Sequence, residues 1–455
     1  MALTNKIISR KVDIRMPLLK RLFWLYFLLL IFEGALRKWF LPQLSAPLLL
    51  IRDPLALLII WEAYRTRKWP KQWSSVIGIL SVALIILCCV QVAIGENPWI
   101  VALYGMRSYL LPFPVAFIIG ANLDEDDLRK FGVCTLWILL PLTALAVAQY
   151  LAPSSSILNK GAYTGMTQLD YASGHVRASE TFSFVNGPTN YVPMAAAFIF
   201  YGLVNDKFVK KWLLWAASFA TVLSIPVIGS RTQIVLLLAV VACVATAAMF
   251  GVSQLAGSVK VIAALLIVSA GVSQLPVFSE AMNTLEARLT SSSRSEGGAE
   301  GSLTKRVMGP IVEAIDEGFS SEVWYGHGMG LGSNAAATLM TGKQGFLAGE
   351  DETYRVVTEL GGLCGLSFML FRYLLALLIA AQALSRVRAY HPLAWFLVPV
   401  VFTGLTSGVL EQPTLQGFMV VSVGFCLAAL KIEPVAAIPV LQVSEPIIHR
   451  RRLDA

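Results

Sequence analysis

The chain is a succession of long apolar runs separated by short polar segments, with one long polar interruption at about 277–355. Most runs span about 17 to 23 residues, enough for an α-helix to cross the hydrocarbon core of a bilayer. The alternation over about ten residues that is typical of an outer-membrane β-strand is absent. The pattern predicts an all-α integral membrane protein with about twelve transmembrane helices. We expect these helices at residues 22–39, 47–63, 75–94, 99–121, 131–151, 190–204, 212–228, 233–251, 258–276, 356–384, 393–410 and 415–431.

The apolar runs divide the chain into four parts. Residues 1–276 hold the first nine predicted helices and an outer loop at 152–189. Residues 277–355 form one large, partly helical loop between the ninth and tenth helices, residues 356–432 hold the last three helices, and residues 433–455 form a tail.

The distribution of Lys and Arg orients these helices. With the N-terminus in the cytoplasm, the positively charged segments YRTRKWPKQ, NDKFVKK, SRVRAYH and HRRR all fall inside. The outside segments GENPW and EQPT contain no Lys or Arg, as the positive-inside rule requires. Both termini are therefore predicted to be cytoplasmic, and the loop 152–189, the turn Gly229–Thr232 and the large loop share the outer face.

The large loop contains three different stretches. The segment at Ser291–Ser302 has low complexity, whereas the residues that follow it have apolar side chains at helical spacing. This spacing predicts a short amphipathic helix on the membrane or on the bundle, with an apolar face made by Val307, Ile311, Ile315 and Phe319. The sequence WYGHGMGLGS then predicts a tight backbone turn, because it has glycine at Gly326, Gly328, Gly330 and Gly332.

Composition agrees with a membrane protein. Of the 455 residues, 56% are hydrophobic and 14% are charged, against roughly a quarter charged in a soluble domain. The net charge of +8 is a topology signal here, so we expect no nucleic-acid partner. All six cysteines fall inside predicted helices, which gives no indication of a disulfide-stabilised outer domain, a metal site or another cofactor. The basic N-terminus has no small-residue cleavage site, so the first helix is expected to be retained.

Three arginines are candidates for binding an anionic group. Arg231 lies at the outer turn between two helices, Arg177 lies in the loop segment VRASETFSFVNGPTNY, and Arg107 lies within a predicted span. A guanidinium suits a phosphate because it is always charged and presents a planar fork of donors. Each arginine or its segment has a structural alternative. Arg231 would be an interfacial anchor, the segment that contains Arg177 would cap a helix through Thr189 or Asn190, and Arg107 would belong to an ion pair.

Two other groups of charges have simpler interpretations. Arg52 and Asp53 are expected to neutralise each other or a neighbouring helix, and Arg372 is expected to extend to the cytoplasmic interface.

Two segments supply candidates for a general base. Glu350, Asp351 and Glu352 stand together before the tenth helix, and close carboxylates raise the pKa of at least one of them. The alternative is an acidic helix N-terminus favoured by the helix dipole. His327, between glycines of the predicted turn, is a further candidate.

The order of these segments resembles one known family. RASETFSFVNGPTNY, then GSRT, then the loop segment TKRVMGPIVEAIDEGFSSEVWYGHGMG and finally TYRVVTELGGLCGL are similar to the motifs of the bacterial O-antigen ligase and polymerase family. The resemblance implies a glycosyltransferase in the bacterial inner membrane with a periplasmic catalytic loop. It implies that an undecaprenyl-diphosphate-linked glycan is the donor, that a sugar hydroxyl of a glycan or lipid-linked acceptor is the second substrate, and that no metal is required. Polysaccharide-assembly proteins are further expected partners.

The resemblance also implies roles for individual residues. Arg177, Arg231 and Arg306 match arginines of the family and are expected to bind the diphosphate. Arg107 is a further candidate contact because it is a charge within a predicted span, and not because of the resemblance. Glu350 occupies the position at which the ligase branch has histidine, so Glu350 or Asp351, or otherwise His327, is the expected base. Glu180 stands where the first motif usually has glycine. These departures leave a ligase, a polymerase and a divergent branch open.

Two other functions remain open from sequence. About twelve helices are also common in secondary transporters, although those tend to show repeated halves and polar groups at the membrane midplane. A non-catalytic protein of envelope polysaccharide assembly is the third alternative.

Overall fold

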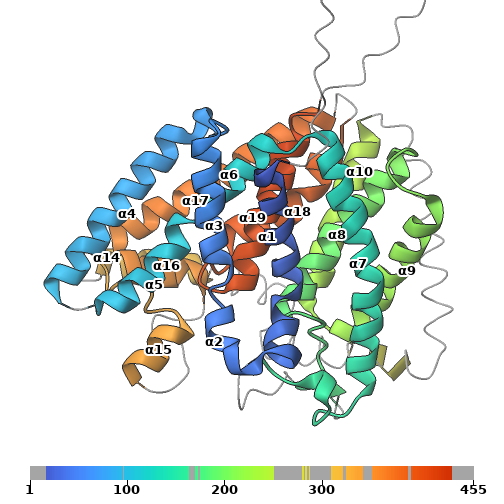
Figure 1. Ribbon diagram of the computed structural model, residues 1–455, viewed down its shortest axis with the longest axis horizontal. Coiled ribbons are helices and arrows are strands. Elements are labelled where there is room, and N and C mark those ends of the chain that lie inside the picture. The colour runs from blue at the N-terminus through green and yellow to red at the C-terminus, as the bar shows by residue number, and fades with distance from the viewer. Residues whose placement is uncertain are drawn as a thin grey trace, which may run out of the picture.

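The structure is a computed structural model that describes residues 17–95, 97–162, 170–172, 175–250, 279–280, 282–283, 286, 309–320, 324–341, 351–387 and 391–432. It confirms an all-α architecture (Figure 1). The first half contains α1 (Leu18–Ala35), the π-helix η1 (Leu36–Phe40), the 3₁₀ helix η2 (Pro42–Leu44), α2 (Ser45–Leu48), α3 (Arg52–Arg65), η3 (Lys71–Trp73), α4 (Ser74–Ile94), α5 (Trp99–Leu110), α6 (Pro112–Asn122), α7 (Glu125–Leu151), η4 (Ile157–Asn159), β1 (Asp170–Ala172) and β2 (His175–Val176). The second half contains α8 (Asn186–Val204), α9 (Lys211–Ile228), α10 (Arg231–Met249), α14 (Gly309–Ser320), α15 (Asn334–Thr341), α16 (Glu352–Leu360), α17 (Gly362–Val387), α18 (Leu393–Thr406) and α19 (Pro413–Ala429).

Many of these helices are suited to a membrane. Among the described residues, 7 helical segments are long and apolar enough to cross a bilayer, judged by length and composition. The chain is therefore a multi-pass membrane protein. The segments are Pro42–Arg65, Lys71–Ile94, Trp99–Asn122, Glu125–Leu151, Lys211–Ile228, Arg231–Met249 and Gly362–Val387, and Leu393–Thr406 and Pro413–Ala429 are shorter apolar helices.

Every predicted helix overlaps a helix of the structure, except that at 258–276, which lies outside the described residues. Three predicted helices are divided, and the one at 47–63 is interrupted by the turn between α2 and α3. The helix predicted at 99–121 is interrupted at Leu111, because Pro112 and Pro114 lack the N–H donors that would continue the helical hydrogen bonds. The helix predicted at 356–384 is interrupted at Gly361, which has φ +81°, and α16 precedes the break.

The start of α8 corrects one expectation. The sequence suggested Thr189 or Asn190 as the cap of this helix, but α8 begins at Asn186 and has no side-chain cap. Thr189 and Asn190 lie inside the first turns and donate back to the carbonyls of Val185 and Asn186. Pro188 is compatible with this earlier start because the N–H groups of a helix's first turn have no intrahelical acceptor.

The core of the bundle is built around α8, α18 and α19. Helix α8 contacts α7, α9, α10, α18 and α19, and nearly all its side chains are buried. Helix α19 packs on α6 and α18 as well. A helix that is apolar on all sides belongs in the interior of a protein. The more exposed helices α3, α4, α9 and α17 lie around this centre in Figure 1.

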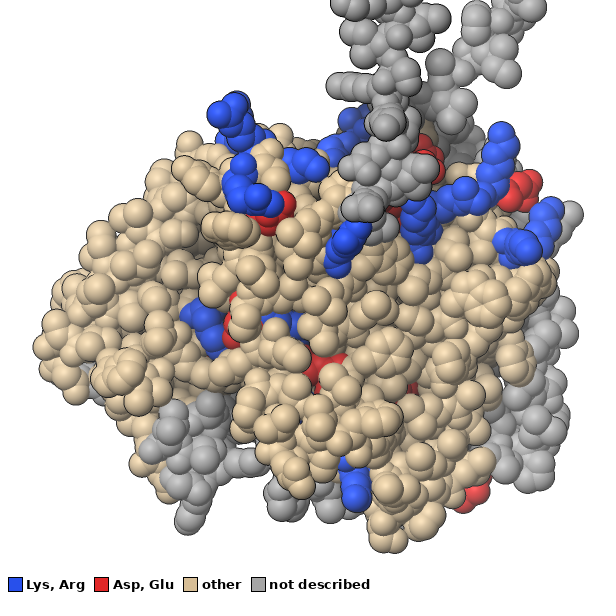
Figure 2. Space-filling view, viewed as in Figure 1, with Lys and Arg blue, Asp and Glu red and all other residues tan. Residues whose placement is uncertain are grey.

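Among the described residues, the two ends of the bundle differ in charge on the face shown in Figure 2. Lys and Arg side chains gather at the upper end in Figure 2, where α1 begins and α19 finishes. Lys20 of α1 forms ion pairs with Asp124 and Asp127 at the start of α7, and Lys431 after α19 donates to the Leu123 carbonyl at 3.0 Å. This asymmetry agrees with the predicted positive-inside orientation, in which the opposite end is the outer face.

The predicted amphipathic helix corresponds to α14, although Val307 lies outside the described residues. Helix α14 packs on α16 and α17 through its buried residue Ala314. Ile315 is exposed, and Phe319 is 82% exposed. The helix therefore lies on the bundle and leaves part of its apolar face uncovered.

Candidate functional site

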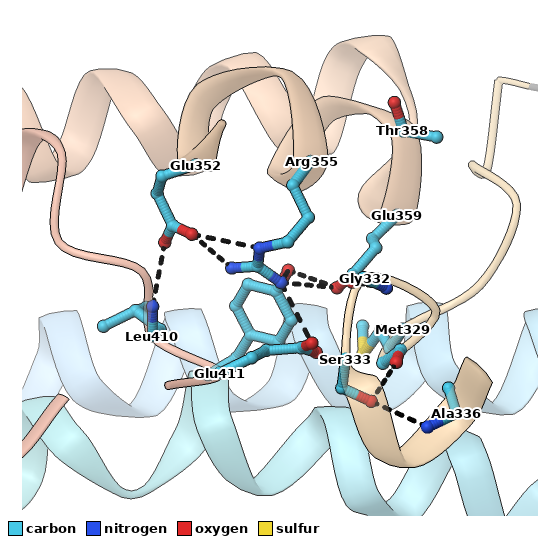
Figure 3. A network of polar contacts seen from close by, with 12 residues as sticks. Met329, Gly332, Ser333, Ala336, Glu352, Arg355, Thr358, Glu359, Leu410 and Glu411 are labelled. Carbon is cyan, nitrogen blue, oxygen red and sulfur yellow. Dashed lines mark hydrogen bonds and ion pairs between the residues drawn. The ribbon is translucent and has the colours of Figure 1, made fainter. Parts of the chain in front are cut away.

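Helix α16 carries a buried network of charged side chains (Figure 3). Arg355 pairs with Glu352 through Nη2 and Oε2 at 2.6 Å, and with Glu359 through Nη1 and Oε2 at 3.0 Å. Spacings of three and four residues place all three side chains on one face of the helix. All three are almost fully buried. Such a cluster is stable only if its charges are paired and hydrogen-bonded.

Three neighbouring elements complete the pairing. The hydroxyl of Tyr109, on α5, donates to Oε2 of Glu359 at 2.6 Å. The backbone N–H of Gly332 donates to Oε1 of the same carboxylate at 2.7 Å. Arg372, on α17, is fully buried and pairs with Glu352. Arg372 therefore does not extend to the cytoplasmic interface, as its position in the sequence suggested, because its guanidinium is bound inside the bundle.

The glycine-rich turn is held against this network. Gln91 Nε2 donates to the carbonyls of Tyr325 and Glu359, both at 2.7 Å. Gly326, Gly328 and Gly330 all have positive φ, which confirms the predicted tight turn. A Cβ on Gly330 would lie 2.5 Å from the Val101 carbonyl oxygen, so this position also requires the absence of a side chain.

Glu411, in the loop between α18 and α19, is the unusual member of the cluster. It is 5% exposed, and its Oε1 lies 3.4 Å from Nη1 of Arg355. Neither carboxylate oxygen receives a hydrogen bond from the residues that the structure describes. Burial and the neighbouring charge of Glu359 raise the pKa of Glu411 well above the ordinary value, while Arg355 and Arg107 act against this increase. Glu411 thus combines a buried position with a raised proton affinity, a shift in the direction that favours a general base.

Arg107 faces the same cluster from α5. Its Nη1 lies 2.9 Å from Oδ2 of Asp53, and its guanidinium lies over the ring of Tyr104 at 4.1 Å. Its Nε and Nη2 are buried and have no hydrogen-bond partner in the described part of the chain. These two donors are available for an anion.

A second set of buried charges joins α1 to α3. Arg52 Nε donates to Oε2 of Glu33 at 2.9 Å, and Arg52 Nη2 donates to the carbonyl of Pro413 at the start of α19. Nη1 of Arg37 lies 3.6 Å from Oε1 of Glu33. Arg52 and Asp53 were expected to pair with each other or with charges of a neighbouring helix. The second alternative is confirmed, because Arg52 pairs with Glu33 of α1 and Asp53 pairs with Arg107 of α5.

The segment at Ser179–Ser183 adds a further buried carboxylate. Glu180 is fully buried, and its backbone has φ +54°, a conformation that favours glycine. Burial raises the pKa of Glu180 to about 8, while the charge of Lys38 acts against this increase. Lys38 donates to the Glu180 carbonyl, and Nη1 of Arg37 donates to Ser183 Oγ at 2.9 Å. The end of the first helix is therefore bound to this loop.

The site residues expected from sequence fall into two neighbourhoods. Ala178, next to Arg177, and Val227, near the end of α9, belong to one small apolar cluster, so the segments that carry Arg177 and Arg231 pack together. Arg177 is buried, and Arg231 is the first residue of α10. Arg107 belongs to the other neighbourhood, around α16.

Asp351 and His327 also lie beside α16. Asp351 is the N-cap of this helix, and its Oδ1 accepts a hydrogen bond from the Thr353 N–H at 2.9 Å. Burial raises the pKa of Asp351, and the capping hydrogen bonds partly offset this. The side chain of His327 is exposed, while its backbone N–H donates to Thr358 O at 2.8 Å. Glu350 and Arg306 lie outside the described residues.

Sequence reasoning missed most of the network. It treated Glu352 as part of an acidic helix start and gave no role to Glu33, Lys38 or Glu411. A usable signal existed for Glu33 and Lys38, because both lie inside a predicted span, where charge is costly. The segment EQPT, which contains Glu411, was used only for topology. No group of three or more His, Cys, Asp or Glu suited to a metal ion occurs within the described ranges.

Comparison with models of known protein families gave no match for this chain, and comparison with curated proteins gave none either.

Proposed function

We propose that this chain is a glycosyltransferase of the O-antigen ligase or polymerase type, acting at the outer face of the bacterial inner membrane. One observation carries the proposal: a buried carboxylate with raised pKa, Glu411, lies in a cluster that also contains Arg355 and the available donors of Arg107. A base beside cations is what transfer from a diphosphate leaving group requires. The resemblance of the motifs supplies the substrate class, an undecaprenyl-diphosphate-linked glycan.

The proposed reaction is a single displacement. Glu411 accepts the proton of an acceptor sugar hydroxyl, and that oxygen attacks the anomeric carbon of the donor. The bond between this carbon and the diphosphate oxygen breaks, and undecaprenyl diphosphate leaves with the bonding electron pair. Arg107 stabilises the charge that develops on the diphosphate.

The residues implied by the resemblance keep their roles in the proposal. Arg177, Arg231 and Arg306 bind more distant parts of the donor diphosphate or its glycan. Glu350, Asp351 and His327 remain alternative bases. Asp351 is the weaker alternative on geometry, since its carboxylate already caps α16.

A secondary transporter is the second candidate function. Buried ion pairs between helices, such as Arg52 with Glu33 and Arg107 with Asp53, are common where a transporter binds its substrate or coupling ion. A non-catalytic assembly protein is the third candidate. The assembly protein does not need a carboxylate with raised pKa, whereas a proton-coupled transporter would also use one.

One reconstituted assay separates the candidates. Purified protein in liposomes is given lipid-diphosphate-linked oligosaccharide and an acceptor, and release of undecaprenyl diphosphate is measured. We expect Glu411→Gln to lower the rate about 100-fold, the lower end of general acid–base contributions. Glu313→Gln is the matched control, because Glu313 is an exposed carboxylate on α14.

If Glu411→Gln retains the rate of the wild-type protein, Glu411 is not the base, and the proposal as a whole is wrong if the wild-type protein itself releases no undecaprenyl diphosphate. Solute uptake by the same liposomes without consumption of the lipid-linked donor would identify a transporter. Absence of both activities, with assembly in cells that is lost on deletion but not in Glu411→Gln, would identify an assembly protein.

A further inference from the structure

A cavity of about 530 Å³ lies at the opposite end of the bundle from the candidate site. Its walls come from η3, the end of α6, the end of α17 and the end of α19. This is the end at which Lys and Arg gather (Figure 2), and the predicted orientation places it in the cytoplasm. The volume falls within the range of about 300–1,000 Å³ that is usual for small-ligand sites.

The floor of the cavity is apolar and aromatic. Trp73 stacks on Phe117 with ring centroids 4.4 Å apart and an interplanar angle of 9°. Leu427 and Leu430 of the α19 end complete the floor. Trp is enriched at the membrane interface, because its ring suits the boundary between acyl chains and water. The floor is therefore suited to the glycerol and upper acyl region of a lipid.

The rim of the cavity is cationic and polar. Arg386, in the last turn of α17, and Lys431 both line it, together with Gln72, Gln382 and Ser385. The guanidinium of Arg386 has no hydrogen bond or ion pair with the residues that the structure describes. Lys431 Nζ donates to the carbonyls of Ala121 and Leu123, which leaves one of its three N–H donors for a ligand.

We propose that this cavity binds the phosphate headgroup of an anionic phospholipid from the cytoplasmic leaflet. Basic pockets between transmembrane helices on this side bind such headgroups, and one phosphate would contact both Arg386 and Lys431. The amide and hydroxyl side chains of the rim suit the hydroxyl groups of a glycerol headgroup. The site joins the ends of α6, α17 and α19, so an occupying lipid also links these helices. This inference does not depend on the proposed glycosyl transfer.

Native mass spectrometry of the full chain in detergent tests the site. The protein is titrated with phosphatidylglycerol, phosphatidylcholine or inorganic phosphate. We expect retention of phosphatidylglycerol over phosphatidylcholine, and about a five-fold weaker retention in Arg386→Gln, consistent with about 1 kcal/mol for one cation at the membrane surface. Lys207→Gln is the matched control, because Lys207 is an exposed cation at the same end, in the turn between α8 and α9.

Three results would overturn the proposal. The first is equal retention of the two lipids, and the second is unchanged retention of phosphatidylglycerol in Arg386→Gln. The third is binding of inorganic phosphate as tight as that of the lipid, because this would indicate a site for a soluble anion. The thermal midpoint of Arg386→Gln is measured first. We expect it to equal that of the wild-type protein in lipid-free detergent and to rise less than the wild-type midpoint when phosphatidylglycerol is added.

Discussion

Arg372 of α17 is fully buried and pairs with Glu352 of α16, so that two helices separated by Gly361 are joined by an ion pair. Arg372 Nε also donates to the Leu405 carbonyl at 2.6 Å, and Nη2 donates to Gly408 O at 2.8 Å, both at the end of α18. One side chain therefore connects α16, α17 and α18. The side chain of Arg372 therefore holds α16 against α17 and the end of α18.

Replacing Arg372 by Gln is expected to destabilise the protein by roughly 3–5 kcal/mol, because it leaves a buried carboxylate without its cation. Arg372→Lys should recover only part of this loss, since an ammonium lacks the planar fork that reaches three carbonyls and a carboxylate. Denaturant unfolding in detergent measures the difference. Lys130→Gln, at an exposed position of α7, is the control. Wild-type stability in Arg372→Gln would contradict a structural role.

Gly330→Ala is expected to disrupt the glycine-rich turn. The residue has φ +91°, and an added Cβ would meet backbone atoms of Val101 and Gly105 at 3.0 Å or less. We expect a clear fall in stability and loss of the polar network around Glu359, which the turn contacts. Gly78→Ala is the control, because its added Cβ would meet nothing within 4 Å in α4 and alanine favours a helix. Thermal unfolding of both variants tests this, and equal melting temperatures would contradict it.

The fold was largely predictable, because apolar run length reports helices directly. The breaks at Leu111 and Gly361 were missed, since long apolar runs pass through both positions. That these segments meet at one end of the bundle was predictable in part: Asn97 of GENPW donates to the Met329 carbonyl at 2.9 Å, and Glu411 of EQPT lies beside Arg355. Charge asymmetry indicated that these segments face the same side.

The buried network was much less predictable. Its members come from α5, α16, α17 and the α18–α19 loop, and no local spacing shows that such distant residues meet. The spacing of Glu352, Arg355 and Glu359 would equally suit an exposed helix with surface ion pairs. Only the packing of α16 between α14 and α17 distinguishes the two cases.

Asp53 and Arg107 are expected to be energetically coupled. Their ion pair is 2.9 Å long and largely buried, so a double-mutant cycle with Asp53→Asn and Arg107→Gln should give a coupling energy of about 0.5–3 kcal/mol in unfolding. If Arg107 also binds the diphosphate, the double variant regains stability relative to Arg107→Gln without regaining transfer activity. Recovery of both properties together would assign Arg107 a structural role only.

Glu180 is expected to make stability depend on pH. Its folded-state pKa of about 8 lies above the ordinary value of 4.5, so between these values the folded protein holds a proton that the unfolded chain lacks. This contribution to stability is therefore fully present below about pH 4.5 and is lost as pH rises towards 8. Glu180→Gln should remove this loss, so that its melting temperature relative to wild type increases from pH 5 to pH 9. A pH-independent difference, like that expected for the exposed Glu313→Gln, would contradict the buried neutral carboxyl.

The pH dependence of transfer tests the role of Glu411 most directly. A general base acts only when deprotonated, and the raised pKa of Glu411 means that a substantial fraction is protonated at lower pH. The rate of wild-type protein should therefore rise with pH across the folded-state pKa of Glu411 and then level off. Glu411→Gln should be slow at all pH values and lack this rise. Glu411→Asp should keep the rise at a reduced rate, because it retains a carboxylate that lies one methylene further from the substrate. If Glu411→Gln shows the wild-type profile at a uniformly lower rate, another group is the base and Glu411 acts only by positioning Arg355.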